Sequence, residues 1–80
     1  MSGILSTENF RMDAKKLGKK IKLARVEHDL TQEKLAEAIE STQRSISLIE
    51  NGQTLPSLAA LENLSRVLKK PYSYFLEEVI

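Results

Sequence analysis

The sequence contains no cysteine and a single histidine, His28. Without cysteine the chain can form neither disulfides nor thiolate metal sites, and it has no thiol redox chemistry. One histidine excludes a two-histidine metal site, and no serine stands at a usable spacing from a base. We therefore expect no metal, no cofactor and no enzymatic activity. His28 itself is expected to be a capping or surface residue near the end of a helix.

Long apolar runs are also absent. The longest are three or four residues, far shorter than a membrane span. Ile4-Leu5 is too short for the apolar region of a signal peptide. The chain of 80 residues fits one domain, and 41% hydrophobic with 29% charged residues is typical of a folded domain rather than a disordered one. We expect a cytoplasmic protein that does not enter a membrane.

The net charge of +1 says little about a nucleic-acid partner, but the charges are unevenly distributed. Residues 15–25 carry six basic side chains and no acid, whereas residues 27–40 carry five acids and one lysine. The fold is therefore expected to have a basic edge and an acidic edge. A basic run alone is typical of a solvated helix face. Beside a helix-turn-helix, contact with DNA phosphates is favoured instead.

Apolar spacing predicts helices along the chain, and strand patterns are absent. We predict helices at about residues 13–28, 32–40, 43–51, 58–68 and 72–78. Residues 1–12 are expected to form an N-terminal arm, part of which packs back or meets a partner chain, and residues 13–80 one domain. The expected N-caps are Asp13, Thr31, Thr42 and Ser57. Leu17, Ile21 and Ala24 are expected to face the core from the first helix, and Leu58, Leu61, Leu64 and Leu68 from the fourth.

The segment from Leu30 to Gly52 predicts two short helices joined by a tight turn, which is a helix-turn-helix. Its expected core positions are Leu35, Ala36, Ile39, Ile46 and Ile49. The turn lacks glycine, so Glu40 or Ser41 must adopt the backbone conformation that the turn requires. The outward face of the second helix is polar, as expected of a helix that reads the major groove of DNA.

The order and spacing of these motifs resemble the phage repressor and Cro type of helix-turn-helix domain, also called the XRE family. The matching motifs are Leu17-Gly18-x-x-Ile21-Lys22-x-x-Arg25, Leu30-Thr31-Gln32-x-x-Leu35-Ala36, Thr42-Gln43-x-x-Ile46-Ser47-x-Ile49-Glu50-Asn51-Gly52 and Pro56-Ser57-Leu58-x-x-Leu61. The resemblance covers residues 17–76. It implies an all-α, compact five-helix, lambda-repressor-like bundle that binds double-stranded DNA as a homodimer at a near-palindromic operator.

Two positions depart from the family pattern. The family often has glycine where this chain has Asp29 and Glu40, both of them at helix ends. Glycine adopts the left-handed backbone of a helix end more easily than other residues do. Glu40 also places a negative charge near the turn that faces DNA, which is expected to lower the affinity rather than abolish binding.

The residues implied to contact bases lie on the outward face of the second helix of the motif: Gln43, Arg44, Ser47 and Leu48. Gln43 can form a bidentate pair with adenine, and Arg44 can do so with guanine. Leu48 fits a thymine methyl group, or alternatively packs against Leu55 or the next helix.

The residues implied to contact phosphates are Gln32, Thr42, Asn51 and Lys22. Gln32 opens a helix, where free backbone N–H groups suit an anion. Thr42 and Asn51 have helix capping as their ordinary alternative. Arg25 and Glu50 are implied to form a partly buried ion pair between the first and third helices, with a structural role.

We expect a sequence-specific transcriptional regulator, either a repressor that occludes polymerase or an activator that contacts it. Glu33 and Glu37 could contact RNA polymerase, although a solvated helix face is their ordinary role. A restriction-modification controller, a phage or plasmid repressor, an antitoxin and the DNA-binding part of a longer regulator all fit. The alternative from another class is a protein-interaction adaptor or antitoxin-like module that keeps the fold without specific DNA binding.

A homodimer is expected because one helix reads too few base pairs for much specificity. The C-terminal segment is richer in apolar side chains than a short helix needs for its own core. We therefore predict the dimer interface at Tyr72, Phe75, Leu76, Val79 and Ile80, with the N-terminal arm as second choice.

Overall fold

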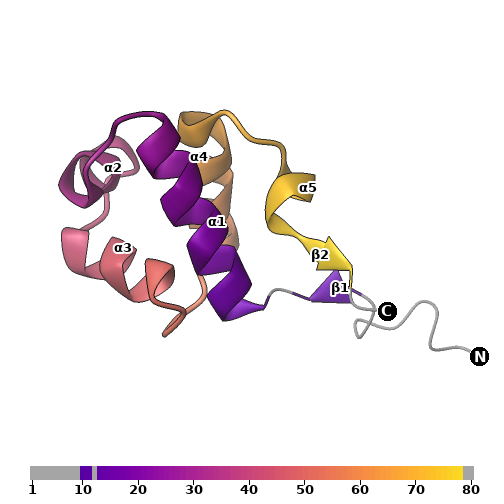
Figure 1. The fold of residues 1–80 in the computed structure, drawn as a ribbon. Coiled ribbons are helices and arrows are strands. Elements are labelled where there is room, and N and C mark those ends of the chain that lie inside the picture. Colours follow the sequence, from indigo (N-terminus) through magenta and orange to yellow (C-terminus); the bar gives the residue numbers. More distant parts are fainter. Residues whose placement is uncertain (1–9, 12, 79–80) are drawn as a thin grey trace, which may run out of the picture.

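The computed structural model describes residues 10–11 and 13–78. Five helices run in chain order as α1 (Ala14–Glu27), α2 (Gln32–Ala38), α3 (Gln43–Glu50), α4 (Leu58–Leu68) and α5 (Tyr72–Phe75). A two-residue strand precedes them and another follows them, β1 (Phe10–Arg11) and β2 (Glu77–Glu78). Figure 1 shows α1 at the centre in front of α4, with α2 and α3 on one side and α5 on the other. The predicted all-α bundle is thus confirmed.

Side-chain caps begin the first four helices, as predicted. Asp13 accepts hydrogen bonds from the backbone N–H groups of Lys15 and Lys16. Thr31, Thr42 and Ser57 each accept from the backbone N–H three residues further on, at 3.0–3.1 Å. Each cap satisfies an N–H group that has no partner inside its helix, and is typically worth about 1 kcal/mol.

Three helices end at a non-glycine residue in the left-handed conformation. The φ angles are 56° at Asp29, 55° at Glu40 and 57° at Lys69, and Gly52 has 76° after α3. A side chain in this conformation crowds the following carbonyl, at a cost of about 1–2 kcal/mol. In the turn between α2 and α3, Glu40 and not Ser41 therefore adopts the left-handed backbone conformation. The left-handed conformation of Lys69 was not predicted from the sequence.

The core lies where α1, α2, α3 and α4 meet, and Phe75 closes it from α5. Its buried side chains are Leu17, Ile21, Ala24, Leu35, Ala36, Ile39, Ile46, Ile49, Leu61, Leu64, Leu68 and Phe75. All five predicted core positions of the helix-turn-helix are among them. Leu58 was expected to join this core, but 77% of it is exposed because it stands at the first position of α4, beyond the packed stretch.

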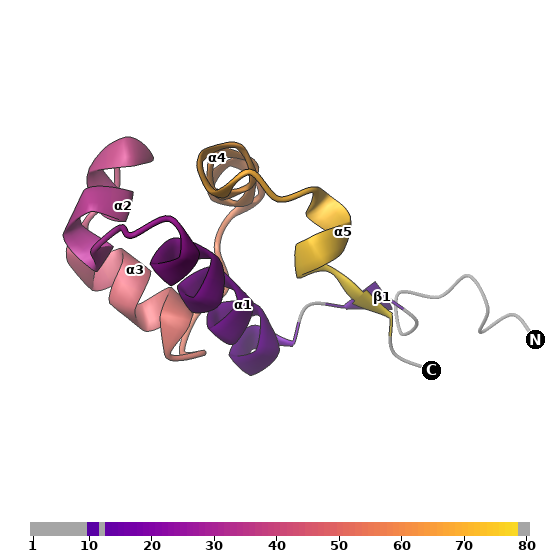
Figure 2. The same cartoon turned by 45° about the horizontal axis from the view of Figure 1, so that its top comes forward.

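Polar contacts attach the middle and the C-terminal end of α1 to α4, to α5 and to the connection between them. His28 ends α1, and its Nε2 lies 2.7 Å from the backbone oxygen of Leu68. Lys20 Nζ donates to the backbone oxygen of Tyr74 at 2.9 Å. Lys70 lies 3.3 Å from Glu27 and its ammonium also covers the Tyr74 ring. These contacts hold the C-terminal part of the fold on the side of α1 away from α3 (Figure 2).

The C-terminal prediction was wrong in its extent. The helix expected at residues 72–78 ends at Phe75, and Leu76 is already extended, with ψ at 136°. Phe10 then pairs with Glu78 and Arg11 with Glu77 in an antiparallel ladder, so two residues of the expected arm are tied to the C-terminal segment. Residues 1–9 and 12 of the arm, with Val79 and Ile80, lie outside the described residues. No helix in the described part of the chain is long and apolar enough to cross a membrane.

Candidate nucleic-acid interface

Helix α3 turns a polar face away from the core. Ile46 and Ile49 fix its rotation because both are buried. Gln43 and Arg44 are exposed near its start, while Ser47 and Leu48 are half-buried one turn later. These four residues and Gln32 of α2 line a shallow hollow of about 390 Å³. The fold therefore brings all four residues implied to contact bases onto one surface.

Two side chains that form hydrogen bonds, Gln32 and Thr42, lie at the starts of α2 and α3. The Thr42 hydroxyl oxygen accepts from the N–H of Ser45 at 3.1 Å, and a hydroxyl that accepts in this way can still donate its own proton. Gln32 is already engaged, because its Nε2 donates to Glu50 Oε1 at 3.0 Å. One N–H and the amide oxygen of Gln32 remain for another partner. The capping bond of Thr42 was predicted, but the bond from Gln32 was not.

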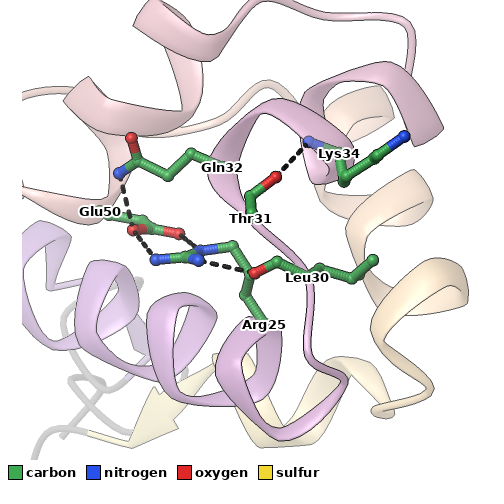
Figure 3. A network of polar contacts seen from close by, with 6 residues as sticks. All are labelled: Arg25, Leu30, Thr31, Gln32, Lys34 and Glu50. Atoms are coloured by element: carbon green, nitrogen blue, oxygen red, sulfur yellow. Dashed lines mark hydrogen bonds and ion pairs between the residues drawn. The ribbon is translucent and has the colours of Figure 1, made fainter.

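The implied ion pair between Arg25 and Glu50 is present and almost fully buried (Figure 3). Arg25 Nε lies 2.7 Å from Glu50 Oε2, and Nη2 lies 3.2 Å from Oε1. Arg25 Nη1 also donates to the backbone oxygen of Leu30 at 2.7 Å. Only 2% of the Glu50 side chain and 12% of the Arg25 side chain are exposed. The carboxylate thus receives three hydrogen bonds, counting the one from Gln32, which compensates for its loss of water.

Gly18 allows α1 and α3 to approach closely. A Cβ atom at this position would lie 2.4 Å from the backbone oxygen of Ile49 and 2.6 Å from that of Glu50. The neighbours are backbone atoms, so no side-chain rotation could relieve the overlap. The close contact at Gly18 was not predicted from the sequence, where Gly18 is part of the motif Leu17-Gly18-x-x-Ile21. The available signal was a glycine inside a helix, directly after a core leucine, where alanine would otherwise be the better helix former.

The other two residues implied to contact phosphates do not line the hollow beside α3. Asn51 is exposed directly after α3, and its backbone N–H is bonded to the oxygen of Ser47. Lys22 is exposed on α1. The candidate surface therefore comprises the hollow between α2 and α3, with Asn51 and Lys22 as exposed residues outside its lining.

The predicted dimer residues separate into different environments. Tyr72 and Leu76 are each 43% exposed, and with Leu58 they line an apolar hollow between α4 and α5. Phe75 was placed wrongly, because it is 1% exposed and packs into the core, with its ring 5.1 Å from that of Tyr74. Apolar spacing alone could not distinguish the inward from the outward side of this short helix.

The two short helices α2 and α3, joined by a tight turn and packed in a helical bundle, place this domain in the helix-turn-helix class. The sequence profile described as helix-turn-helix (HTH_3) matches residues 21–75, and the chain belongs to this family. The resemblance drawn from the sequence motifs is thereby confirmed. A relative in Sinorhizobium medicae, described as an uncharacterized HTH-type transcriptional regulator, is 34% identical over 62 residues. The match covers 78% of this chain but 45% of that relative, so the chain spans less than half its length.

Two solved structures share the fold closely. The restriction-modification controller protein C.AhdI from Aeromonas hydrophila superposes with a TM-score of 0.74 at 25% identity, covering 79% of this chain and 96% of C.AhdI. PlcR from Bacillus thuringiensis, solved with the peptide PapR7 and DNA, gives a TM-score of 0.73 at 40% identity. That match covers 78% of this chain and 22% of PlcR. The fold is therefore that of helix-turn-helix transcriptional regulators.

Proposed function

We propose that this protein is a sequence-specific DNA-binding transcriptional regulator that inserts α3 into the major groove. The observation that carries the proposal is the outward face of α3, where Gln43, Arg44, Ser47 and Leu48 surround one hollow while Ile46 anchors the opposite face. A helix fixed in this way presents its N-terminal side chains to base edges.

Each residue on that face has a chemically suitable partner in the groove. Arg44 is exposed and can donate two hydrogen bonds to guanine O6 and N7, while Gln43 can pair with adenine N6 and N7. Leu48 is half-buried at the wall of the hollow, where a thymine methyl group would cover its remaining surface. A good bidentate pair contributes about 1–3 kcal/mol of discrimination against a wrong base.

Phosphate contacts would fix the position of α3 in the groove. Gln32 has a remaining N–H and Thr42 a hydroxyl proton, while Asn51, at the end of α3, and Lys22, on α1, are exposed. Because Glu50 holds Gln32, the ion pair would also orient this phosphate contact. Such contacts add affinity and carry no sequence information directly.

Two copies would bind a near-palindromic operator, because a dimer doubles the number of bases read. The exposed apolar side chains of Leu58, Tyr72 and Leu76 are the candidate dimer surface on this chain. Bound at a promoter, the protein would occlude RNA polymerase, or would contact it through the exposed residues Glu33 and Glu37 of α2.

A salt titration distinguishes this function from that of an adaptor that binds only proteins. Fluorescence anisotropy would follow the full chain binding a mixed-sequence duplex between about 50 and 200 mM salt. A DNA-binding protein loses affinity steeply over this range because bound phosphates release counterions. Absence of salt-dependent binding at the lowest salt would reject the proposal in favour of the adaptor.

A further inference from the structure

Three exposed lysines of α1 form a stripe that the fold itself does not require. Lys15, Lys19 and Lys22 are spaced at i, i+4 and i+7, so they share one face of the helix. The core face of the same helix carries Leu17 and Ile21 instead. Lys15 and Lys22 are seven residues apart, about 10 Å along the helix axis, which exceeds the reach of a single phosphate.

Lys15 lies directly against the loop that follows α3. A Cβ atom at Gly52 would lie 2.8 Å from Lys15 Cγ and 3.0 Å from its Cα. The stem of Lys15 therefore crosses Gly52, in the space that its missing side chain leaves open. Gly52 is the neighbour of Asn51, one of the residues proposed to contact a phosphate. Lys15, the first residue of the lysine stripe, therefore lies next to the residue that follows Asn51, the last proposed phosphate contact of α3.

The rest of the stripe runs beside α3. Figure 2 shows α1 and α3 side by side, and Gly18 touches the backbone of α3 between Lys15 and Lys22. Asp13 lies at the start of the stripe and accepts a hydrogen bond from the backbone N–H of Lys15. A hydrogen bond from the backbone N–H of Lys16 holds the pKa of Asp13 below its ordinary value of 3.8. Asp13 is therefore ionised at neutral pH and offsets part of the positive charge of Lys15 at the start of the stripe.

We infer that Lys15 and Lys19 are further DNA phosphate contacts, which continue the backbone contact of Asn51 along α1 to Lys22. This inference rests on the proposed function and deepens it, because it adds α1 to the surface that holds DNA. A positive charge at Lys15 also complements the negative dipole end of α3, which is its purely structural role. The two roles differ in what they predict for DNA binding.

The test is the double variant K15Q/K19Q, with K69Q as the matched control for loss of positive charge. Lys69 is exposed at the end of α4, close to His28 and therefore at the opposite end of α1 from Lys15. Anisotropy titrations at several salt concentrations would give the slope of log K against log salt for each protein. Each lost phosphate contact reduces that slope by about 0.9, so we expect a reduction of about 1.8 in K15Q/K19Q. K69Q should keep the wild-type slope.

The remaining outcomes separate the inference from the proposed function. Salt-dependent binding by the wild type with an unchanged slope in K15Q/K19Q would overturn the inference and leave the function standing. Equal reductions in K15Q/K19Q and K69Q would overturn it too, because they would reflect net charge alone. No binding by the wild type would overturn the proposed function together with the inference. Circular dichroism melting curves of the variants would confirm that each is folded.

Discussion

Gly18 of α1 determines how closely α1 approaches α3, the helix that carries the candidate DNA-binding surface. In an exposed helix, replacing glycine by alanine stabilises by about 1 kcal/mol. Here the new methyl group would overlap the backbone oxygens of Ile49 and Glu50, 2.4 and 2.6 Å away. We expect Gly18→Ala to lower the free energy of unfolding by about 1–3 kcal/mol, as overpacking of a core does. Urea denaturation followed by circular dichroism measures this change.

A control on the same helix is Leu23→Ala, because Leu23 is 60% exposed and contributes little to the core. It should change the free energy of unfolding by no more than about 0.5 kcal/mol. A Gly18→Ala protein as stable as the wild type would show that α1 and α3 can separate without cost.

Glu40 holds the turn between α2 and α3 with a φ of 55°, a conformation that glycine adopts without strain. We expect Glu40→Gly to raise the free energy of unfolding by about 0.5–1 kcal/mol, because the left-handed strain of about 1–2 kcal/mol exceeds the extra entropy of the unfolded chain. Thermal melting measures it. Glu37→Gly removes the same charge inside α2 and should instead destabilise by about 1 kcal/mol. Equal decreases in the free energy of unfolding in both variants would show that the backbone at Glu40 is not strained.

At the scale of the elements, one buried network joins three helices and a loop. Arg25 comes from α1, Gln32 from α2 and Glu50 from α3, and Arg25 also bonds the Leu30 backbone between α1 and α2 (Figure 3). Because the bonds from Arg25 and from Gln32 both meet at Glu50, we propose that the network sets the angle of α3 against α1. It contributes orientation more than net stability, since burying an ion pair is costly in itself.

Removing Glu50 tests this proposal. In Glu50→Ala the guanidinium of Arg25 stays buried without its partner, so we expect a loss of about 3–5 kcal/mol in the free energy of unfolding. Because α3 would lose its orientation, DNA affinity should fall by the same factor for every duplex. Calorimetry and anisotropy measure the two effects. Lys34→Ala is the control, since its exposed pair with Glu37 spans 3.9 Å and contributes little. Intact stability in Glu50→Ala would contradict the proposal.

The sequence predicted the first four helices better than the C-terminal segment, for physical reasons. Caps such as Thr31 and Thr42 act within three residues, so their chemistry is local and readable. The pairing of residues 10–11 with 77–78 joins opposite ends of the chain and is too short for an alternating pattern. The bond from Gln32 to Glu50 likewise depends on how two helices cross, which spacing along the chain does not specify. Outward positions on α3 were predictable because Ile46 and Ile49 fix its rotation.

At the scale of the whole molecule, the candidate surfaces lie on different sides. Figure 1 shows α1 between α3 and α5. The residues that line the apolar hollow come from α4, α5 and Leu76, and none of them lines the hollow beside α3. A second copy could therefore pack against Leu58, Tyr72 and Leu76 without covering the residues proposed to contact bases. This arrangement suits a dimer that presents two copies of α3 to neighbouring half-sites.

Substitutions at this hollow should separate dimerisation from folding. Leu76→Glu places a charge at a position that is 43% exposed, so we expect a folded monomer in sedimentation velocity experiments. Phe75→Glu should unfold the chain instead, because it buries an unpaired charge in the core. Leu23→Glu, on the exposed side of α1, should leave the oligomeric state unchanged. A folded dimer of Leu76→Glu would reject the hollow as the interface.

In vitro selection from a random pool of duplexes, performed with the wild type and with Arg44→Ala, tests the central claim about α3 most directly. We predict that the wild type enriches two inverted half-sites about 34 Å apart, centre to centre. In Arg44→Ala, a guanine at one position of each half-site should lose its enrichment while the flanking positions keep theirs. Enrichment of no sequence by the wild type, or of the same guanine by both proteins, would contradict the account.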